Sequence, residues 1–233
     1  GTMTMPLLTT KLYLPPARPK LVPRPRLVGQ LNAGLHRKLT LISAPAGFGK
    51  TTLLSEWIAD SGHSVAWLSL DAGDNNPIRF WRYIVAALGT LEPSIGKAAL
   101  AVLESPQPPA TESIVTVLAN SIVTASQAAP AQPEGPHLPY TLVLDDYHVI
   151  EAESIHQGLN FWLDHWPSAL HLILVTRSDP PLALSRRRGR SEIMEIRAAD
   201  LRFTTEEATE FLNQVMDLGL TTEDVVTLEQ RTE

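Results

Sequence analysis

The chain has 233 residues, of which 44% are hydrophobic and 19% are charged, so it can bury a sizeable core and is not intrinsically disordered. Its net charge of −6 indicates no excess of basic residues, which argues against nucleic-acid binding by this chain alone. It contains no cysteine, which excludes disulfides and thiolate metal sites. Because we find no apolar run of transmembrane length and no signal peptide, we expect a cytoplasmic protein with no membrane partner.

The pattern along the chain predicts three regions. Residues 1–29 are rich in proline and are expected to form an extended strap along a surface. Residues 30–200 are expected to form a P-loop nucleotide-binding domain, for the reasons given below. Residues 201–233 are expected to open a helical subdomain that the chain truncates. Thr204 and Glu207 support this last region, since they have capping-box spacing at the start of a predicted helix.

Residues 39–52 predict a buried strand that runs into a phosphate-binding loop. After the apolar run 39–43 the sequence reads Ala44-Pro45-Ala46-Gly47-Phe48-Gly49-Lys50-Thr51-Thr52. Glycines let backbone N–H groups surround an anion, a lysine brings charge to the β- and γ-phosphates, and a threonine hydroxyl binds magnesium. We therefore assign nucleotide binding to residues 46–52, a catalytic charge to Lys50 and a magnesium ligand to Thr51.

The strict loop pattern has glycine where this chain has Ala44. The context outweighs this departure, because an apolar strand precedes the loop and an amphipathic helix follows it, ending near Gly62. The alternative, a glycine-rich turn with an incidental lysine, is the weaker interpretation.

From Leu39 onward, strand candidates alternate with helical patterns, which is typical of a parallel sheet with helices on both faces. The expected strands are 39–43, 64–70, 140–145, 169–175 and 191–196. Two or three helices lie between the second and third strands, and two of them are predicted over 77–89 and 111–125; a further helix is predicted over 204–216. The fold class that follows is α/β, a three-layer P-loop NTPase with a mainly parallel five-stranded sheet.

Two carboxylates end the predicted strand over 140–145. Asp145 and Asp146 lie at the carboxyl end of an apolar run, where ligands of parallel sheets gather. We expect Asp145 to hold magnesium through water and Asp146 to polarise the attacking water as a catalytic residue. The alternative is a carboxylate pair that solvates the strand end or caps the next helix. His148 follows closely, and we assign it no role, because a lone histidine there is more often a packed or capping residue.

Arg177 follows the predicted strand over 169–175 and is a candidate for contacting the γ-phosphate. The alternative is a surface arginine that pairs with Asp179. The arginine cluster at 186–190 is interpreted as a solvated face rather than a phosphate or partner contact.

With these residues in place, the chain resembles the large ATP-dependent LuxR-type regulators of the STAND class of signal-transduction ATPases, of which the maltose-regulon activator is typical. The matching segments follow one another along nearly the whole chain: 10–13, 22–27, 43–52, 70–83, 144–148, 176–181 and 196–204. Alanine at the position of Ala44 is common in this family.

The resemblance implies a molecular switch that ADP holds inactive and that ATP, together with an inducer, permits to self-associate. It implies that Arg24 helps to clamp the nucleotide and that Arg177 senses the γ-phosphate. The implied cofactors are ATP or ADP and Mg²⁺. DNA would be bound only through a C-terminal domain that is absent from this chain.

The function that we predict is a nucleotide-binding switch module, with slow magnesium-dependent ATP hydrolysis, in a signal-transduction ATPase that regulates transcription. One alternative is a metabolic P-loop phosphotransferase that acts on a small molecule. It is disfavoured because no acceptor pocket is evident and because the pair Asp145-Asp146 suits the activation of water better. Another is a binding module that has lost hydrolysis.

Overall fold

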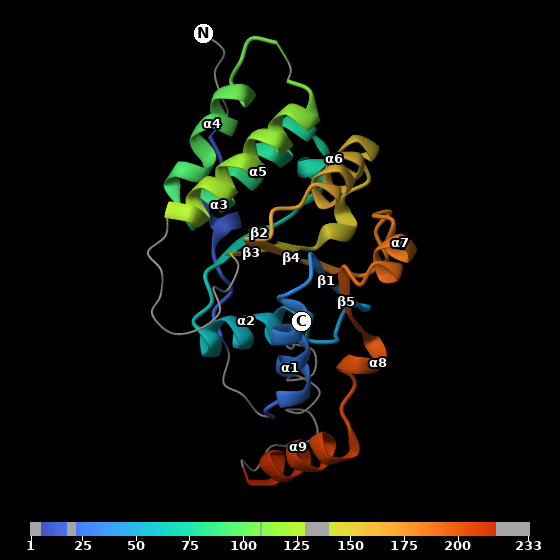
Figure 1. The fold of residues 1–233 in the computed structure, drawn as a ribbon. Coiled ribbons are helices and arrows are strands. Elements are labelled where there is room, and N and C mark those ends of the chain that lie inside the picture. Colours follow the sequence, from blue (N-terminus) through green and yellow to red (C-terminus); the bar gives the residue numbers. More distant parts are fainter. Residues whose placement is uncertain (1–5, 18–21, 108, 129–139, 218–233) are drawn as a thin grey trace.

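The structure, a computed structural model, describes residues 6–17, 22–107, 109–128 and 140–217. Its centre is a five-stranded sheet with the strand order β2-β3-β4-β1-β5, and all neighbouring strands are parallel (Figure 1). The strands are β1 (Leu39–Ser43), β2 (Val65–Ser69), β3 (Tyr140–Asp145), β4 (Leu170–Thr176) and β5 (Ile193–Arg197). The predicted α/β fold class is confirmed, and β1 and β3 have the predicted bounds.

Helices cover both faces of the sheet (Figure 1). One face carries α3 (Pro77–Gly89), α4 (Pro93–Leu103), α5 (Thr111–Ala128) and α6 (Glu153–Asp164), and the other carries α1 (Pro25–Gly34) and α2 (Lys50–Ser61). The shorter α7 (Leu184–Gly189) precedes β5, and α8 (Ala198–Leu201) leads to α9 (Thr205–Asp217), which lies at the end of the molecule beyond α1. The chain also has the short 3-10 helices η1 (Thr9–Leu12), η2 (Ala72–Asn75) and η3 (Tyr147–Val149).

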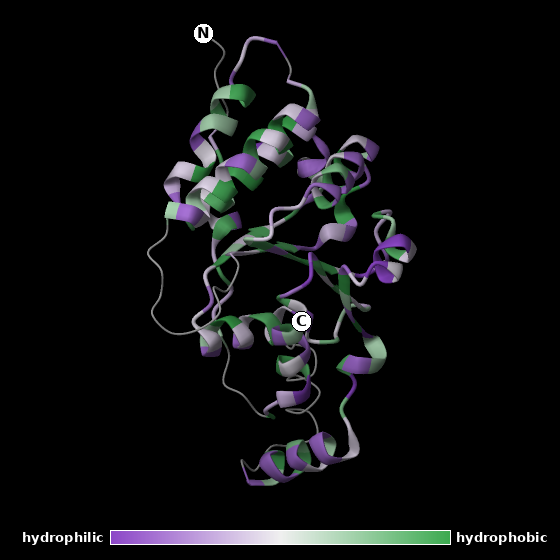
Figure 2. Cartoon of the chain, viewed as in Figure 1, coloured by the Kyte–Doolittle hydropathy of each residue, from purple (hydrophilic) through white to green (hydrophobic). Residues whose placement is uncertain are grey.

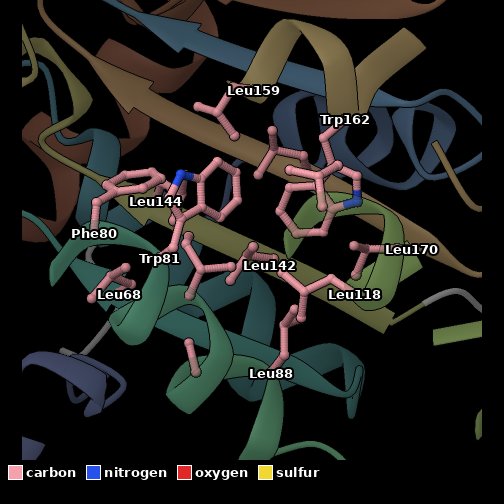
Figure 3. Close-up of a cluster of buried hydrophobic side chains, with 14 of the residues drawn as sticks. Leu68, Phe80, Trp81, Leu88, Leu118, Leu142, Leu144, Leu159, Trp162 and Leu170 are labelled. Carbon is pink, nitrogen blue, oxygen red and sulfur yellow. The ribbon is translucent and has the colours of Figure 1, made fainter. Parts of the chain in front are cut away.

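Two hydrophobic cores lie on opposite faces of the sheet, because successive strand side chains alternate between its faces. In β3, Leu142 and Leu144 belong to the larger core and Val143 to the smaller one. Figure 3 shows the larger core, in which leucines of β2, β3 and β4 pack against aromatic and aliphatic side chains of α3, α5 and α6. Figure 2 shows hydrophobic residues gathered along the sheet and on the helix faces beside it, whereas α7 is largely hydrophilic. Burial on both faces explains why the strands are nearly continuous apolar runs.

The prediction of an extended strap through residue 29 is wrong for residues 25–29, since α1 begins at Pro25. Proline suits the first helical position because its φ angle is already helical and no N–H is needed there. Leu27 and Leu31 then fall on one buried face. Residues 1–5 and 18–21 of the expected strap and residues 218–233 of the expected subdomain lie outside the described residues.

An ion cluster around the buried Lys11 and Asp74 fixes η1 to the start of α3. The Lys11 side chain donates to Asp74, which is fully buried, and to Asp71 at 2.9 Å. Asp74 also accepts from Arg79 Nε at 3.1 Å, and Lys11 Nζ lies 4.3 Å from the centre of the Tyr83 ring. The segment before α1 is therefore held against the β2 edge of the sheet.

Across the described ranges, no helix combines the length and apolar character needed to cross a membrane.

Candidate phosphate-binding site

The loop between β1 and α2 has the backbone geometry of an anion site. Gly47 and Gly49 have φ angles of 86° and 70°, in the left-handed region that glycine adopts without a Cβ penalty. Gly49 is also the N-cap of α2, so the loop leads directly into the amino-terminal turn of this helix, where the helix dipole favours an anion. A Cβ built on Gly47 meets no atom within 4 Å, so the loop leaves open space on that side.

Lys50 is folded over the same loop. Its Nζ donates to the carbonyl oxygens of Ala44 at 2.7 Å and of Pro45 at 2.9 Å, and the residue is 8% exposed. The two carbonyls hold the ammonium group beside the backbone N–H groups of the loop. An anion bound by those N–H groups would therefore meet a preplaced positive charge.

Thr51 and Asp145, which the sequence assigns to magnesium, meet across the loop. The Thr51 hydroxyl donates to Asp145 Oδ2 at 3.3 Å, and the backbone N–H of Asp146 donates to Asp145 Oδ1 at 2.9 Å. Burial and, to a lesser extent, the nearby charge of Asp146 raise the pKa of Asp145 to about 6. The Asp146 N–H, the Thr51 hydroxyl and Lys50 oppose this rise. An ionised carboxylate in this buried position costs free energy unless a cation binds beside it.

The donor atoms of this pair fit a magnesium ion. A hydroxyl and a carboxylate are hard oxygen ligands, and Mg²⁺ in nucleotide sites takes its remaining ligands from water and phosphate. In the part of the chain that the structure describes, no cluster of three or more histidine, cysteine or acidic residues could hold a metal by itself.

Asp146 is exposed and adopts the left-handed conformation, with φ 58° and ψ 39°. Aspartate tolerates this region better than most residues, but the conformation still costs roughly 1–2 kcal/mol. Its side chain makes no capping hydrogen bond to η3, although Asp146 is the N-cap residue, so the capping alternative finds no support. Strain of this kind is frequent at functional sites.

Arg177 follows β4 directly and is exposed. The alternative pairing with Asp179 is not formed: Asp179 instead binds both Nη atoms of Arg197, at 2.9 and 3.1 Å, and accepts from Ser43 Oγ at 3.2 Å. The Arg197 guanidinium holds the pKa of Asp179 below its usual range. Strand register explains why Asp179 pairs with Arg197. Ser43 of β1 is the Cα partner of both Arg197 in β5 and Thr176 in β4, so the ends of the three strands lie side by side.

Arg24 contacts the α8–α9 junction. Its guanidinium donates to the Leu201 carbonyl at 2.6 Å and to Glu207 at 3.2 Å, and it lies over the Phe203 ring at 5.0 Å. None of its described contacts is with the loop at 44–52, so the nucleotide clamp stays a prediction. The sequence reveals neither partner, because both lie at the other end of the chain.

The arginine cluster at 186–190 differs in part from the predicted solvated face. Arg187 has 0% exposure and pairs with Glu192 at 3.1 Å and Asp164 at 3.3 Å. Arg186 pairs with the same Asp164. The cluster therefore fastens α7 to α6 and β5.

The chain is similar in sequence to curated proteins of one kind. No protein-family model matches the chain. The chain is 35% identical to the HTH-type transcriptional regulator MalT of Serratia proteamaculans (strain 568) over 207 residues, which make up 89% of this chain and 22% of that protein. It is also 35% identical to MalT of Vibrio cholerae over 211 residues, 91% of this chain and 22% of that protein. The chain thus spans about a fifth of the length of these curated relatives.

Two solved structures share the fold. One is a Signal Transduction ATPase with Numerous Domains (STAND) protein with a tetratricopeptide repeat sensor from Pyrococcus horikoshii, with a TM-score of 0.57, 17% identity, and coverage of 93% of this chain and 28% of that chain. The other is a Walker-type ATPase of Pyrococcus abyssi, with a TM-score of 0.50, 13% identity, and coverage of 90% and 63%. The chain is therefore similar to MalT over 89% of its length and shares the fold of these two ATPases.

Proposed function

We propose that this chain is the nucleotide-binding switch module of a signal-transduction ATPase that regulates transcription. The observation that carries the proposal is the meeting of Lys50, Thr51 and Asp145 at the carboxyl edge of the sheet, with Thr51 Oγ1 3.3 Å from Asp145 Oδ2. Two similarities support the two halves of the proposal. The MalT relatives are transcriptional regulators, and the Pyrococcus horikoshii protein with the same fold is a signal-transduction ATPase.

Each residue of the site has a proposed role in binding ATP or ADP. The backbone N–H groups of residues 46–52 surround the β- and γ-phosphates, and Lys50 neutralises them. Thr51 and Asp145 hold Mg²⁺, which when bound neutralises charge on the phosphate oxygens. Asp146 polarises the attacking water, and its exposed carboxylate supports this role.

Two arginines complete the proposed site. Arg177 reads the γ-phosphate. Two observations support this role: Arg177 directly follows β4, which lies beside β1, and it has no ion pair within the described residues. Arg24 helps to clamp the nucleotide. Because the Arg24 side chain already contacts Leu201 and Glu207, a nucleotide contact there would also bear on the position of α9.

A single γ-phosphate contact is too weak to operate the switch alone. Moving a two-state equilibrium from 1:99 to 99:1 takes about 5.5 kcal/mol of differential binding. One charge-assisted hydrogen bond from Arg177 contributes roughly 1.5–3 kcal/mol. The remainder must come from inducer binding and self-association in the whole protein, which also holds the proposed DNA-binding domain.

Mass spectrometry of the nucleotide released from the purified chain, together with a phosphate-release assay, tests the proposal. We expect ADP to copurify and ATP hydrolysis to be slow. Nucleotide-free protein that binds ATP weakly and hydrolyses it rapidly would contradict a switch. Transfer of phosphate to a small acceptor in a substrate screen would favour a metabolic phosphotransferase instead.

A further inference from the structure

Asn75 of η2 uses its whole side-chain amide to hold the segment between η3 and α6. Its Nδ2 donates to the Val149 carbonyl at 2.9 Å, and its Oδ1 accepts from the N–H groups of Glu151 at 2.7 Å and Ala152 at 3.0 Å. Nδ2 also donates to the Ala72 carbonyl at 3.0 Å, within η2. These four bonds occupy both donors and both acceptor positions of the amide. One side chain thus joins two segments that are far apart in the sequence.

The segment that Asn75 holds begins at Asp146, the proposed catalytic acid. The Leu70 N–H, directly after β2, donates to the Asp145 carbonyl at 3.1 Å. The Val149 N–H donates to the Asp146 carbonyl at 3.1 Å, and the Val149 carbonyl is the group that Asn75 holds. Both sides of Asp146 are therefore tied to residues 70–76, which connect β2 to α3.

This double attachment matters because the backbone of Asp146 is strained. Its φ angle of 58° lies in the left-handed region, and such a conformation persists only when the surrounding structure over-determines it. An asparagine that served only its own turn would need only the bond to Ala72. The side chain of the neighbouring Asn76 has such a local role, since it caps α3 by accepting from the Arg79 N–H at 3.0 Å.

We propose that Asn75 is a positioning residue for ATP hydrolysis, which holds η3 so that the Asp146 carboxylate stays directed at the attacking water. This inference rests on the proposed function, in which Asp146 polarises that water. In the reaction, the water oxygen bonds to the γ-phosphorus while the bond from that phosphorus to the bridging oxygen breaks. The electron pair of the broken bond stays on ADP, and one water proton leaves through Asp146 to solvent. Asn75 transfers no proton and acts only through the backbone of residues 146–149.

The test compares single-turnover phosphate release from ATP and the Kd for ADP in wild type and three variants of the chain. Asn75→Ala removes all four bonds, so the strained backbone of Asp146 can relax, and we expect phosphate release to slow about tenfold or more. The Kd for ADP should stay within about twofold, because the variant leaves Lys50 and the phosphate loop unchanged. A loss confined to hydrolysis distinguishes the positioning of Asp146 from general damage, which would weaken both.

Asn76→Ala is the matched control. It removes the N-cap of α3 from the same connection but leaves the bonds from Asn75 to residues 149–152. We expect phosphate release within about twofold of wild type, although loss of the cap should lower the stability of this variant in urea.

Asn75→Asp separates the two halves of the amide and keeps the inference testable if Asn75→Ala fails to fold. A carboxylate still accepts from the N–H groups of Glu151 and Ala152, but it cannot donate to the Val149 carbonyl. Because the bond to Val149 is the link to Asp146, we expect phosphate release to slow about threefold or more. The Kd for ADP should again stay within about twofold of wild type.

The inference is overturned by wild-type phosphate release in Asn75→Ala or Asn75→Asp, or by a matching loss of ADP affinity in these variants. An equal slowing in Asn76→Ala also overturns it, since the effect would then belong to the whole connection. A wild-type chain that binds ADP but hydrolyses no ATP overturns the inference and leaves the nucleotide-binding proposal standing. A chain that binds no nucleotide overturns both.

Discussion

Arg197 forms a two-pronged ion pair with Asp179, with nitrogen–oxygen distances of 2.9 and 3.1 Å. Asp179 also accepts from Ser43, the last residue of β1. The pair therefore joins the loop that carries Arg177 to the start of α8 and to the strand that enters the phosphate loop. It lies at the same edge of the sheet as Lys50 and Asp145.

Exposure limits what this pair contributes to stability. The two side chains are 38% and 46% exposed, and surface pairs of this kind are typically worth below about 1 kcal/mol. We expect Asp179→Asn to lower the free energy of unfolding by no more than about 1 kcal/mol, measured by urea denaturation. A loss of about 3 kcal/mol or more would show that the pair behaves as a buried one.

Glu207 is expected to fasten α9 in a pH-dependent way. It accepts from the Thr204 N–H at 2.9 Å, in the predicted capping box, and from Arg24 at 3.2 Å. Burial raises its pKa, but the Thr204 N–H, Arg24 and Arg26 outweigh burial and lower the pKa to about 2. Since the pKa is lower in the folded state, this stability is present above about pH 4.5 and is lost as the pH falls toward 2.

Urea denaturation of Glu207→Gln against wild type checks this expectation. The variant should be less stable by about 1–2 kcal/mol at pH 7, and the two proteins should converge as the pH approaches 2. Thr204→Ala is the matched control for the cap alone and should cost about 1 kcal/mol with little pH dependence. A pH-independent loss in Glu207→Gln would contradict the assignment.

His171 in β4 is expected to destabilise the protein in mild acid. It is fully buried, its Nδ1 lies 2.7 Å from the Arg37 carbonyl, and its Nε2 lies 2.8 Å from Thr40 Oγ1. Because a carbonyl only accepts, Nδ1 carries the proton and Nε2 accepts from the threonine. Burial lowers the pKa of His171 to about 4.

The unfolded chain therefore binds a proton at His171 between pH 6.5 and about 4, and the folded protein does not. Stability should fall by up to about 3 kcal/mol as the pH drops through this window. The measurement is the unfolding free energy of wild type and of His171→Gln at pH 7 and at pH 4. The stability advantage of wild type over the variant should shrink or reverse when the pH is lowered from 7 to 4. If the unfolding free energies of the two proteins fell in parallel with pH, His171 would be ruled out as the cause of the fall.

The local features of the fold were predictable from the sequence because they depend on short-range patterns. Apolar runs such as 140–145 mark strands buried on both faces, and Gly47, Gly49 and Lys50 mark the turn into α2. The capping box of Thr204 was predictable for the same reason. The pairing of Thr51 with Asp145 follows from the rule that ligands gather at the carboxyl ends of parallel strands.

The long-range contacts were not predictable, because they depend on strand order and register. Arg197 meets Asp179 only because β1 lies between β4 and β5. A composition pattern cannot show that Arg24 reaches Glu207. The hydrogen bonds from Asn75 to residues 149–152 become visible only once the surrounding elements are in place.

We predict that the loop around Lys50 binds nucleotide phosphates. Calorimetric titration of ADP with Mg²⁺ into wild type and Lys50→Ala tests it most directly, with circular dichroism to verify that the variant folds. Lys38→Ala is the matched control, because Lys38 precedes the opposite end of β1 and pairs with Glu192 at 3.3 Å. We predict that binding is lost in Lys50→Ala and retained in Lys38→Ala. Undiminished ADP binding by folded Lys50→Ala would show that Lys50 and its loop do not form the phosphate site.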